Sequence, residues 1–306
     1  MIALSFPNIE ELQRMHSEAI EDYVRQSIPE PDRRKLYTCI SKLPGFEQYD
    51  PNDEHYSSDY AWLRRFILTD ILTLRDWATN HADKLRFGYF KDLYLNRFAK
   101  GADHFVDTGR SYNAYTLFDA MNIRVCPYCE HEYLAHVRVE ERDRRTMQFD
   151  HFYPKDDALY PGLAMCFYNL IPCCSSCNTL KLTQAIAANP YDADIETLTS
   201  LHPDIMPGVN IETLSNDDCA INFHASGSMV VNERVLALEQ RYDVLKPEVR
   251  DLLRKKQQFP EEKLEELERM GLFSKEQLKR DLFGAPRAEA KGQELHTKMK
   301  HDLICY

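Results

Sequence analysis

The chain has 306 residues, of which 43% are hydrophobic and 28% are charged. This length and composition predict one large domain or two ordinary ones with a real core, and they argue against a wholly disordered protein. The formal net charge of -11 argues against simple nucleic-acid binding through a generally basic surface. A nucleic-acid function would need a local basic patch, a bound metal or a basic partner.

Neither a membrane span nor a signal peptide is predicted. The sequence has no run of about 18 apolar residues, and residues 1–7 lack the basic start and the apolar stretch of a signal peptide. We therefore expect a cytoplasmic location and no membrane partner.

Residues 1–120 are predicted to form a helical N-terminal region. The spacing of apolar residues predicts helices over residues 8–30, 59–80, 84–100 and 112–121. Pro29 and Pro31 are expected to end the first helix. Between the first two helices, residues 43–53 contain many turn formers and predict a loop.

Residues 121–195 change in composition and are predicted to form a separate domain. They are rich in Cys, Pro and Tyr. Residues 131–138 and 147–153 predict two strands separated by a charged turn at 140–145, and residues 175–182 predict a short helix.

Residues 196–306 are predicted to contain a hairpin and helices. Residues 219–223 and 229–231 predict a small hairpin about Ser226 and Gly227. The apolar stripe from Val235 to Leu252 predicts a core-facing helix. Residues 261–282 are charged and are predicted to be helical, and the polar last twenty residues are expected to be mobile. The sequence therefore predicts a mostly helical α+β protein, with partner docking as one interpretation of its C-terminal part.

Two pairs of cysteines predict a metal site. Cys126 and Cys129 form one Cys-x-x-Cys, and Cys174 and Cys177 form another. In a reducing cytosol such pairs more often bind metal than form disulfides. Four thiolates can surround Zn²⁺ tetrahedrally, so we predict a structural zinc site.

Alternatives to this ligand set remain at this point. Cys173 would give a three-residue gap to Cys177, whereas the two-residue gap of Cys174 matches the first pair. His131 is a minor competitor. A redox pair or free core thiols would also explain the pairs. The other four cysteines are interpreted as core or incidental thiols: Cys39, Cys166, Cys219 and Cys305.

Polar residues between and just after the pairs form a recognisable order. Asp150 and His151 stand at the end of a predicted strand, Asn169 precedes Leu170, and Asn178 directly follows Cys177. The order Cys-x-x-Cys, Asp-His-x-x-Pro, Asn-Leu and Cys-x-x-Cys-Asn-x-x-Lys resembles the HNH endonucleases of the ββα-metal (His-Me) finger group. The resemblance covers about residues 124–192 and implies a zinc-stapled ββα finger flanked by helices. Many relatives have His at the position of Asn178, where Asn is an accepted variant.

The resemblance also implies roles for these residues. His151 would be the general base that takes a proton from water, a task that suits a neutral imidazole. Asn169 would hold the His151 ring through hydrogen bonds to nearby backbone. Asp150 and Asn178 would bind one Mg²⁺ or Mn²⁺, ions that prefer oxygen ligands. Lys181 is expected to contact a phosphate. The implied reaction is hydrolysis of DNA to a 5′ phosphate and a 3′ hydroxyl.

The local charge partly answers the acidic balance. Basic residues near the site are Arg138, Arg142, Arg144, Arg145, Lys155 and Lys181. Acidic residues are interspersed, so a mixed solvated surface explains them equally well. Weak intrinsic affinity for DNA is the resulting hypothesis, which would fit a nuclease that a partner delivers or licenses.

The wider layout resembles a more specific group. A helical N-terminal part leads into Cys-Pro-Tyr-Cys, and Asn-Pro-Tyr-Asp follows the site, as in the HNH (PtuB-like) subunits of Septu-type bacterial anti-phage systems. This resemblance implies a defence effector that works with an ATPase partner. Two alternatives stay open: a non-catalytic zinc module that binds protein or nucleic acid, and a nuclease directed at RNA.

Overall fold

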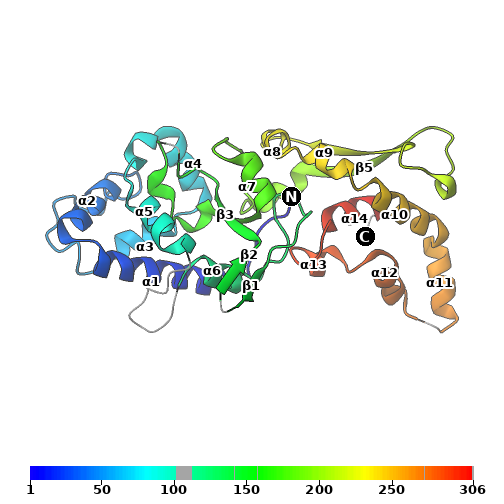
Figure 1. Ribbon diagram of the computed structural model, residues 1–306, viewed down its shortest axis with the longest axis horizontal. Helices are drawn as coiled ribbons and strands as arrows, with labels where there is room; N and C mark the ends of the chain where they lie inside the picture. The colour runs from blue at the N-terminus through cyan, green and yellow to red at the C-terminus, as the bar shows by residue number, and fades with distance from the viewer. Residues whose placement is uncertain (101–111, 141, 157, 272, 305–306) are drawn as a thin grey trace. The chain divides into compact units, whose positions relative to one another are not determined.

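A computed structural model describes residues 1–100, 112–140, 142–156, 158–271 and 273–304, although the side chains of residues 142, 143 and 145 lie outside the description (Figure 1). In this part of the chain, helices dominate and three two-stranded antiparallel sheets occur, which confirms the mostly helical α+β class. No described helix combines the length and the apolar character that a membrane crossing needs.

The chain forms two compact units. The finger unit, as we call it, comprises Leu4–Ile123 and Leu134–Ala185. The C-terminal unit comprises Met1–Ala3, Arg124–Tyr133 and Ile186–Tyr306. The functional boundaries near residues 121 and 196 stay predictions.

The helices of the finger unit follow the apolar spacing of its sequence. They are α1 (Ile9–Ser27), α2 (Glu30–Ile40), α3 (Ala61–Ile67), α4 (Ile71–Asn80), α5 (Tyr89–Asn96) and α6 (Ala114–Met121), with short 3-10 turns at Ala82–Leu85 and Phe98–Lys100. The first predicted helix is confirmed by α1. The single helix predicted over residues 59–80 is wrong, because Asp70 caps a new helix by accepting a hydrogen bond from the Thr73 backbone N–H.

Aromatic side chains fill the core of the finger unit. The Phe66 ring stacks on Trp77 and on Phe90, with 5.6 Å between ring centroids in each pair. Burying each large side chain contributes about 1.5–3 kcal/mol, so this stack fixes α3, α4 and α5 together. From α5, the Tyr94 hydroxyl donates to the carbonyl oxygen of Phe149 at 3.1 Å. The aromatic core therefore supports the strand that carries Asp150 and His151.

The strands of the finger unit differ from those that the sequence predicts. They are β1 (His136–Val139), β2 (Arg142–Arg145), β3 (Met147–His151) and β4 (Leu170–Cys174). The charged turn predicted over 140–145 is wrong, since residues 142–145 form β2, which pairs with β1; the chain reverses at Glu140, where φ is +48°. Instead, β3 pairs with the unpredicted β4, so that His151 faces Leu170 and Asp150 faces Ile171.

The expected finger is completed by the helix after β4. This helix, α7 (Ser175–Lys181), agrees with the one predicted over 175–182 and packs against both β3 and β4 (Figure 1). The order β3, β4, α7 is a ββα unit. Pro172 is tolerated in β4 because a strand of a two-stranded sheet has one edge that needs no N–H donor.

The C-terminal unit pairs a long hairpin with short helices. Its elements are β5 (Thr199–Ile205), β6 (Cys219–Ala225), α8 (Met229–Leu236), α9 (Leu238–Asp243), α10 (Lys246–Gln258), α11 (Glu261–Arg269), α12 (Lys275–Phe283), α13 (Arg287–Ala290) and α14 (Thr297–Ile304), with 3-10 turns at Ala193–Leu198 and Ile211–Thr213. The predicted hairpin is wrong in its partner, because β6 pairs with β5 and Met229 begins a helix.

Two further expectations for this unit are corrected. The stripe from Val235 to Leu252 spans three short helices rather than one, with Ala237 in the left-handed region (φ +50°) between α8 and α9. The last twenty residues include α13 and α14, and α14 packs against β5 and α10 (Figure 1). Burial of Met299 and Leu303 explains why the described part of this segment, up to Ile304, folds onto the unit.

Candidate functional site

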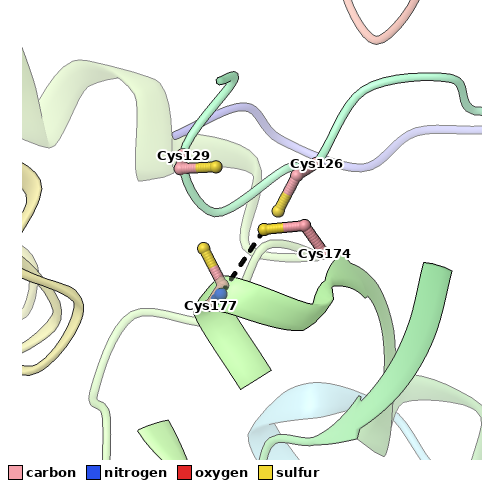
Figure 2. Close-up of side chains that lie close together, drawn as sticks. All are labelled: Cys126, Cys129, Cys174 and Cys177. Atoms are coloured by element: carbon pink, nitrogen blue, oxygen red, sulfur yellow. Dashed lines mark hydrogen bonds between the residues drawn. The ribbon is translucent and has the colours of Figure 1, made fainter. Parts of the chain in front are cut away.

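Four buried cysteines gather at one point in the structure. Their sulfur atoms all lie within 4.8 Å of one another; the four residues are Cys126, Cys129, Cys174 and Cys177. Figure 2 shows the four side chains converging, the first pair from a loop and the second pair from the start of α7. These are the four cysteines that the two-residue gaps single out.

Backbone N–H groups donate a hydrogen bond to one sulfur of each cysteine pair. The N–H of His131 donates to Cys129 Sγ, and the N–H of Cys177 donates to Cys174 Sγ, each at 3.4 Å. Such hydrogen bonds favour a thiolate over a thiol. The first loop closes tightly, because the Glu130 N–H donates to the Cys126 carbonyl and Glu130 adopts a φ of +57°.

The donor set fits a structural metal ion such as zinc. A tetrahedral ion with Zn–S bonds of about 2.3 Å needs sulfurs about 3.8 Å apart, which the observed grouping accommodates. No cysteine in the described ranges forms a disulfide. A buried four-cysteine cluster of this kind could hold a metal, and four thiolates match the closed coordination of structural zinc.

The alternative ligands lie elsewhere. Cys173 is buried outside the cluster, and burial beside Asp150 raises the pKa of its thiol well above the usual value. His131 bonds through Nε2 to the carbonyl oxygen of Arg241. Of the remaining cysteines, Cys166 and Cys219 are buried, Cys39 is half-buried and Cys305 lies outside the described residues.

His151, at the end of β3, is buried in a defined orientation. Only 4% of the surface of this residue is exposed. Nε2 lies 3.0 Å from the carbonyl oxygen of Ala164, and the ring meets Tyr94 edge-on with 4.4 Å between centroids. A carbonyl oxygen only accepts hydrogen bonds, so Nε2 carries the proton and Nδ1 carries the lone pair.

The environment keeps this imidazole neutral. Burial, together with the nearby positive charge of Lys155, lowers the pKa of His151 to about 3. The histidine therefore offers a lone pair on Nδ1 throughout the neutral pH range, as a general base requires.

Three successive backbone carbonyl groups accept hydrogen bonds from side chains, and one of them holds the His151 ring. The carbonyl oxygens of Leu163, Ala164 and Met165 accept hydrogen bonds from Asn169 Nδ2 (2.9 Å), His151 Nε2 (3.0 Å) and His16 Nε2 (2.7 Å) respectively. Asn169 also accepts from the Tyr153 N–H at 2.7 Å. Asn169 thus bonds to the backbone near His151, as the sequence predicts.

Sequence reasoning missed two members of this arrangement. Tyr94 and His16 come from α5 and α1, far from the Cys-x-x-Cys motifs in sequence. His16 is fully buried, with Nδ1 2.6 Å from the Tyr112 hydroxyl. The only available signal was a histidine within the apolar stripe of α1, which by itself does not distinguish a core residue from a site residue.

Asp150 and Asn178 contribute oxygens from β3 and α7. Asp150 is 3% exposed, and its Oδ1 lies 3.0 Å from Lys181 Nζ. Asn178 is half-buried and donates through Nδ2 to Gln148 Oε1. One carboxylate and one amide oxygen are a donor set that suits Mg²⁺, which usually keeps several waters. The donor types of the two residues therefore suit a hard divalent ion.

Lys181 has a placement that the sequence does not predict. The sequence predicts a phosphate contact, whereas the structure buries Lys181 completely. Its ammonium group contacts Asp150 and donates to the His151 carbonyl oxygen at 2.7 Å. The cause is the geometry of α7, which ends at Lys181 and directs this side chain toward β3.

Other basic groups lie nearer the surface. Lys155 is half-buried, with Nζ 5.4 Å from the centre of the Tyr94 ring, and it pairs with Asp156. In the β1–β2 hairpin, Arg138 lies opposite Asp143 and Arg144 lies opposite Val137. Arg144 is exposed. The side chains of Arg142 and Arg145 lie outside the description.

Comparison with known proteins gives one informative similarity. A stretch of 101 residues is 33% identical to Septu protein PtuB of Bacillus thuringiensis and covers 31% of this chain and 35% of that protein. The chain thus matches about a third of the length of this relative. Searches against known protein families and against solved structures found no match. The chain is therefore similar in part to a Septu protein, and it carries a buried four-cysteine cluster that could hold zinc.

Proposed function

We propose that this chain is a metal-dependent HNH endonuclease that hydrolyses DNA, acting as an anti-phage defence effector with an ATPase partner. The ββα unit, the four-cysteine cluster and the similarity to Septu protein PtuB support this function. The observation that carries the proposal is the orientation of His151, whose Nε2 proton is committed to the Ala164 carbonyl.

The proposed reaction uses this orientation directly. His151 Nδ1 takes a proton from water as the water oxygen attacks phosphorus, and the bond from phosphorus to the 3′ oxygen breaks. Asp150 and Asn178 would hold Mg²⁺ or Mn²⁺, which when bound stabilises negative charge on the phosphate and on the leaving oxygen. Asn169 keeps the Tyr153 and Leu163 backbone in place, so that the Ala164 carbonyl stays aligned with the imidazole.

The partner proposal follows from charge and similarity. A formal net charge of -11 leaves the chain poorly equipped to hold DNA strongly alone. A partner that supplies DNA affinity or activation would remove this difficulty, and an ATPase is the partner that the Septu-like resemblance implies.

The test is cleavage of plasmid DNA and of RNA by the purified protein in Mg²⁺ or Mn²⁺, alone and with the product of any neighbouring gene. We expect His151→Ala to lower the cleavage rate by about 100-fold to 10,000-fold, the usual contribution of a general base. His224→Ala is the matched control, because this exposed histidine on β6 lies in the C-terminal unit.

The possible results distinguish a DNA nuclease, an RNA nuclease and a zinc module without nuclease activity. Cleavage that depends on His151 and on the divalent ion supports the endonuclease. Cleavage of an RNA substrate alone would replace DNA by RNA as the target. The absence of His151-dependent cleavage under every condition would leave a zinc module without nuclease activity and overturn the proposal.

A further inference from the structure

Among the ion pairs of the described residues of the finger unit, the Asp150–Lys181 pair is the most enclosed. The side chains of Lys181 and Asp150 are 0% and 3% exposed, and 3.0 Å separates Nζ from Oδ1. By contrast, the pairs of Lys155 and Lys91 with Asp156 involve a carboxylate whose side chain is 53% exposed. An ion pair shielded from water interacts far more strongly than an exposed one.

The Lys181 ammonium is held at two points. Besides Asp150, it donates at 2.7 Å to the carbonyl oxygen of His151. It lies in the last turn of α7, where a positive charge is favoured by the helix dipole. Lys181 therefore cannot reach a substrate phosphate without giving up both contacts and the burial of its charge.

We propose that Lys181 is a resident counter-ion of Asp150 that competes with the divalent metal and keeps metal affinity low in the absence of DNA. This inference rests on the proposed function, because it takes Asp150 as a metal ligand. A buried carboxylate is costly without a compensating cation. Lys181 supplies that cation when no metal is bound, and its fixed charge then opposes a divalent ion at the same carboxylate.

The arrangement has a consequence for regulation of the site. A phosphate that enters beside the metal brings negative charge, which offsets the surplus positive charge of Lys181 and the ion together. Metal and DNA therefore bind cooperatively, and the enzyme alone stays mostly without its catalytic ion. Such linkage would restrain cleavage until DNA is delivered.

The experiment measures Mn²⁺ binding to the full-length, zinc-containing protein without DNA, by the electron paramagnetic resonance signal of free Mn²⁺. Lys181→Gln removes the charge but retains an amide donor for Asp150 and the His151 carbonyl. We expect it to bind Mn²⁺ about tenfold more tightly than the unmodified protein. Lys181→Arg keeps the charge and should leave the affinity unchanged within about twofold.

Two further variants make the result specific. Lys155→Met removes a positive charge that pairs with Asp156 rather than Asp150, and it should change Mn²⁺ affinity much less than Lys181→Gln. Asp150→Asn should abolish specific binding in both backgrounds. If Lys181→Gln is poorly folded without metal, its melting temperature should rise more steeply with Mn²⁺ than that of the unmodified protein.

The outcomes separate this inference from the proposed function. Equal or weaker Mn²⁺ binding by Lys181→Gln, with binding still dependent on Asp150, overturns the counter-ion role while leaving the nuclease intact. Binding that does not depend on Asp150 overturns the metal-ligand assignment as well. Failure of the nuclease proposal is read independently, from the absence of His151-dependent cleavage.

Discussion

The four-cysteine cluster and the Asp150–Lys181 pair differ in how the charge of their buried polar atoms can be balanced. Both are buried groups of polar atoms. The cluster brings together four potential anions, whose mutual repulsion as thiolates an ion from outside would offset. The Asp150–Lys181 pair consists of one carboxylate and one ammonium group, so it is electrically balanced before any ion arrives.

On the proposed function, this difference would distinguish a structural metal from a catalytic one. A site that cannot balance its charge internally should bind its ion tightly and permanently. A site with an internal cation should bind an ion weakly and release it readily. The chain would then keep its zinc while exchanging its catalytic metal, and the following predictions test that contrast.

Loss of one cysteine from the cluster should have the largest effect. Cys177→Ser removes a ligand, and structural zinc contributes on the order of 10 kcal/mol in small zinc domains. We expect the zinc content to fall from about one ion per chain to near zero and the melting temperature to drop by more than about 10 °C. Elemental analysis and thermal melting measure both.

The control for this prediction lies one residue outside the cluster. Cys173→Ser alters a buried thiol that is not among the four, so zinc should be retained despite some loss of stability. Zinc loss in Cys173→Ser, with retention in Cys174→Ser, would assign the ligand role to Cys173 instead.

Breaking the ion pair should have the next largest effect. Asp150→Asn and Lys181→Gln each leave one buried charge without its partner, which costs about 3 kcal/mol of unfolding free energy. The double variant leaves neither charge, so its loss should be smaller than the sum by about 2 kcal/mol. Urea unfolding without divalent ions measures this cycle.

An exposed pair supplies the comparison for this cycle. Arg14 and Glu18 lie one turn apart on α1 with side chains 59% and 56% exposed. The same cycle there should give a coupling below about 0.5 kcal/mol. Equal coupling at both places would mean that burial does not strengthen the Asp150–Lys181 pair.

The two sites also differ in how far the sequence predicts them. Each cysteine pair is a local pattern with only two intervening residues, so its spacing alone predicts a knuckle. By contrast, β4 escapes prediction because Leu170–Cys174 is a short apolar run with an internal Pro172. The Lys181 contact depends on how α7 packs against β3, and the Tyr94 and His16 contacts depend on helices near the start of the chain. Such tertiary contacts leave no periodic signal.

A smaller effect should come from His16, which is buried and bonds to the Tyr112 hydroxyl and the Met165 carbonyl, neither of them charged. Its pKa is lowered to about 4 by burial, against an ordinary value of 6.5. The folded protein therefore binds fewer protons than the unfolded chain between these values, and stability falls as pH falls below about 6.5. His16 accounts for about 2 kcal/mol of the loss between pH 7 and pH 5.

His16→Gln should remove this part of the pH dependence. The amide can still donate to the Met165 carbonyl and accept from Tyr112, so the fold should persist. Urea unfolding at pH 7 and pH 5 should show a smaller difference in this variant than in the unmodified protein. Because the cysteines are unchanged, any zinc release at low pH affects both proteins alike. His224→Gln, at an exposed position, should keep the full difference, and an unchanged difference in His16→Gln would contradict the prediction.

The smallest expected effect concerns the orientation of Asn178. In the cysteine cluster, backbone N–H groups direct the sulfur ligands, whereas Asn178 is oriented by another side chain. Its Nδ2 donates to Gln148 Oε1, which leaves Oδ1 on the other side of the amide for the proposed metal ion. Gln148→Leu removes this acceptor and lets the amide rotate.

The loss of one such hydrogen bond is worth about 1 kcal/mol. We therefore expect Gln148→Leu to weaken Mn²⁺ binding about fivefold, while Thr179→Ala, at the exposed position beside Asn178 on α7, leaves it unchanged. Mn²⁺ titration of the three proteins measures the effect. If Asn178→Ala weakens binding but Gln148→Leu does not, then the amide is oriented without Gln148. In that case Asn178 would be held as rigidly as the cysteine sulfurs. The two sites would then differ only through the charge of Lys181.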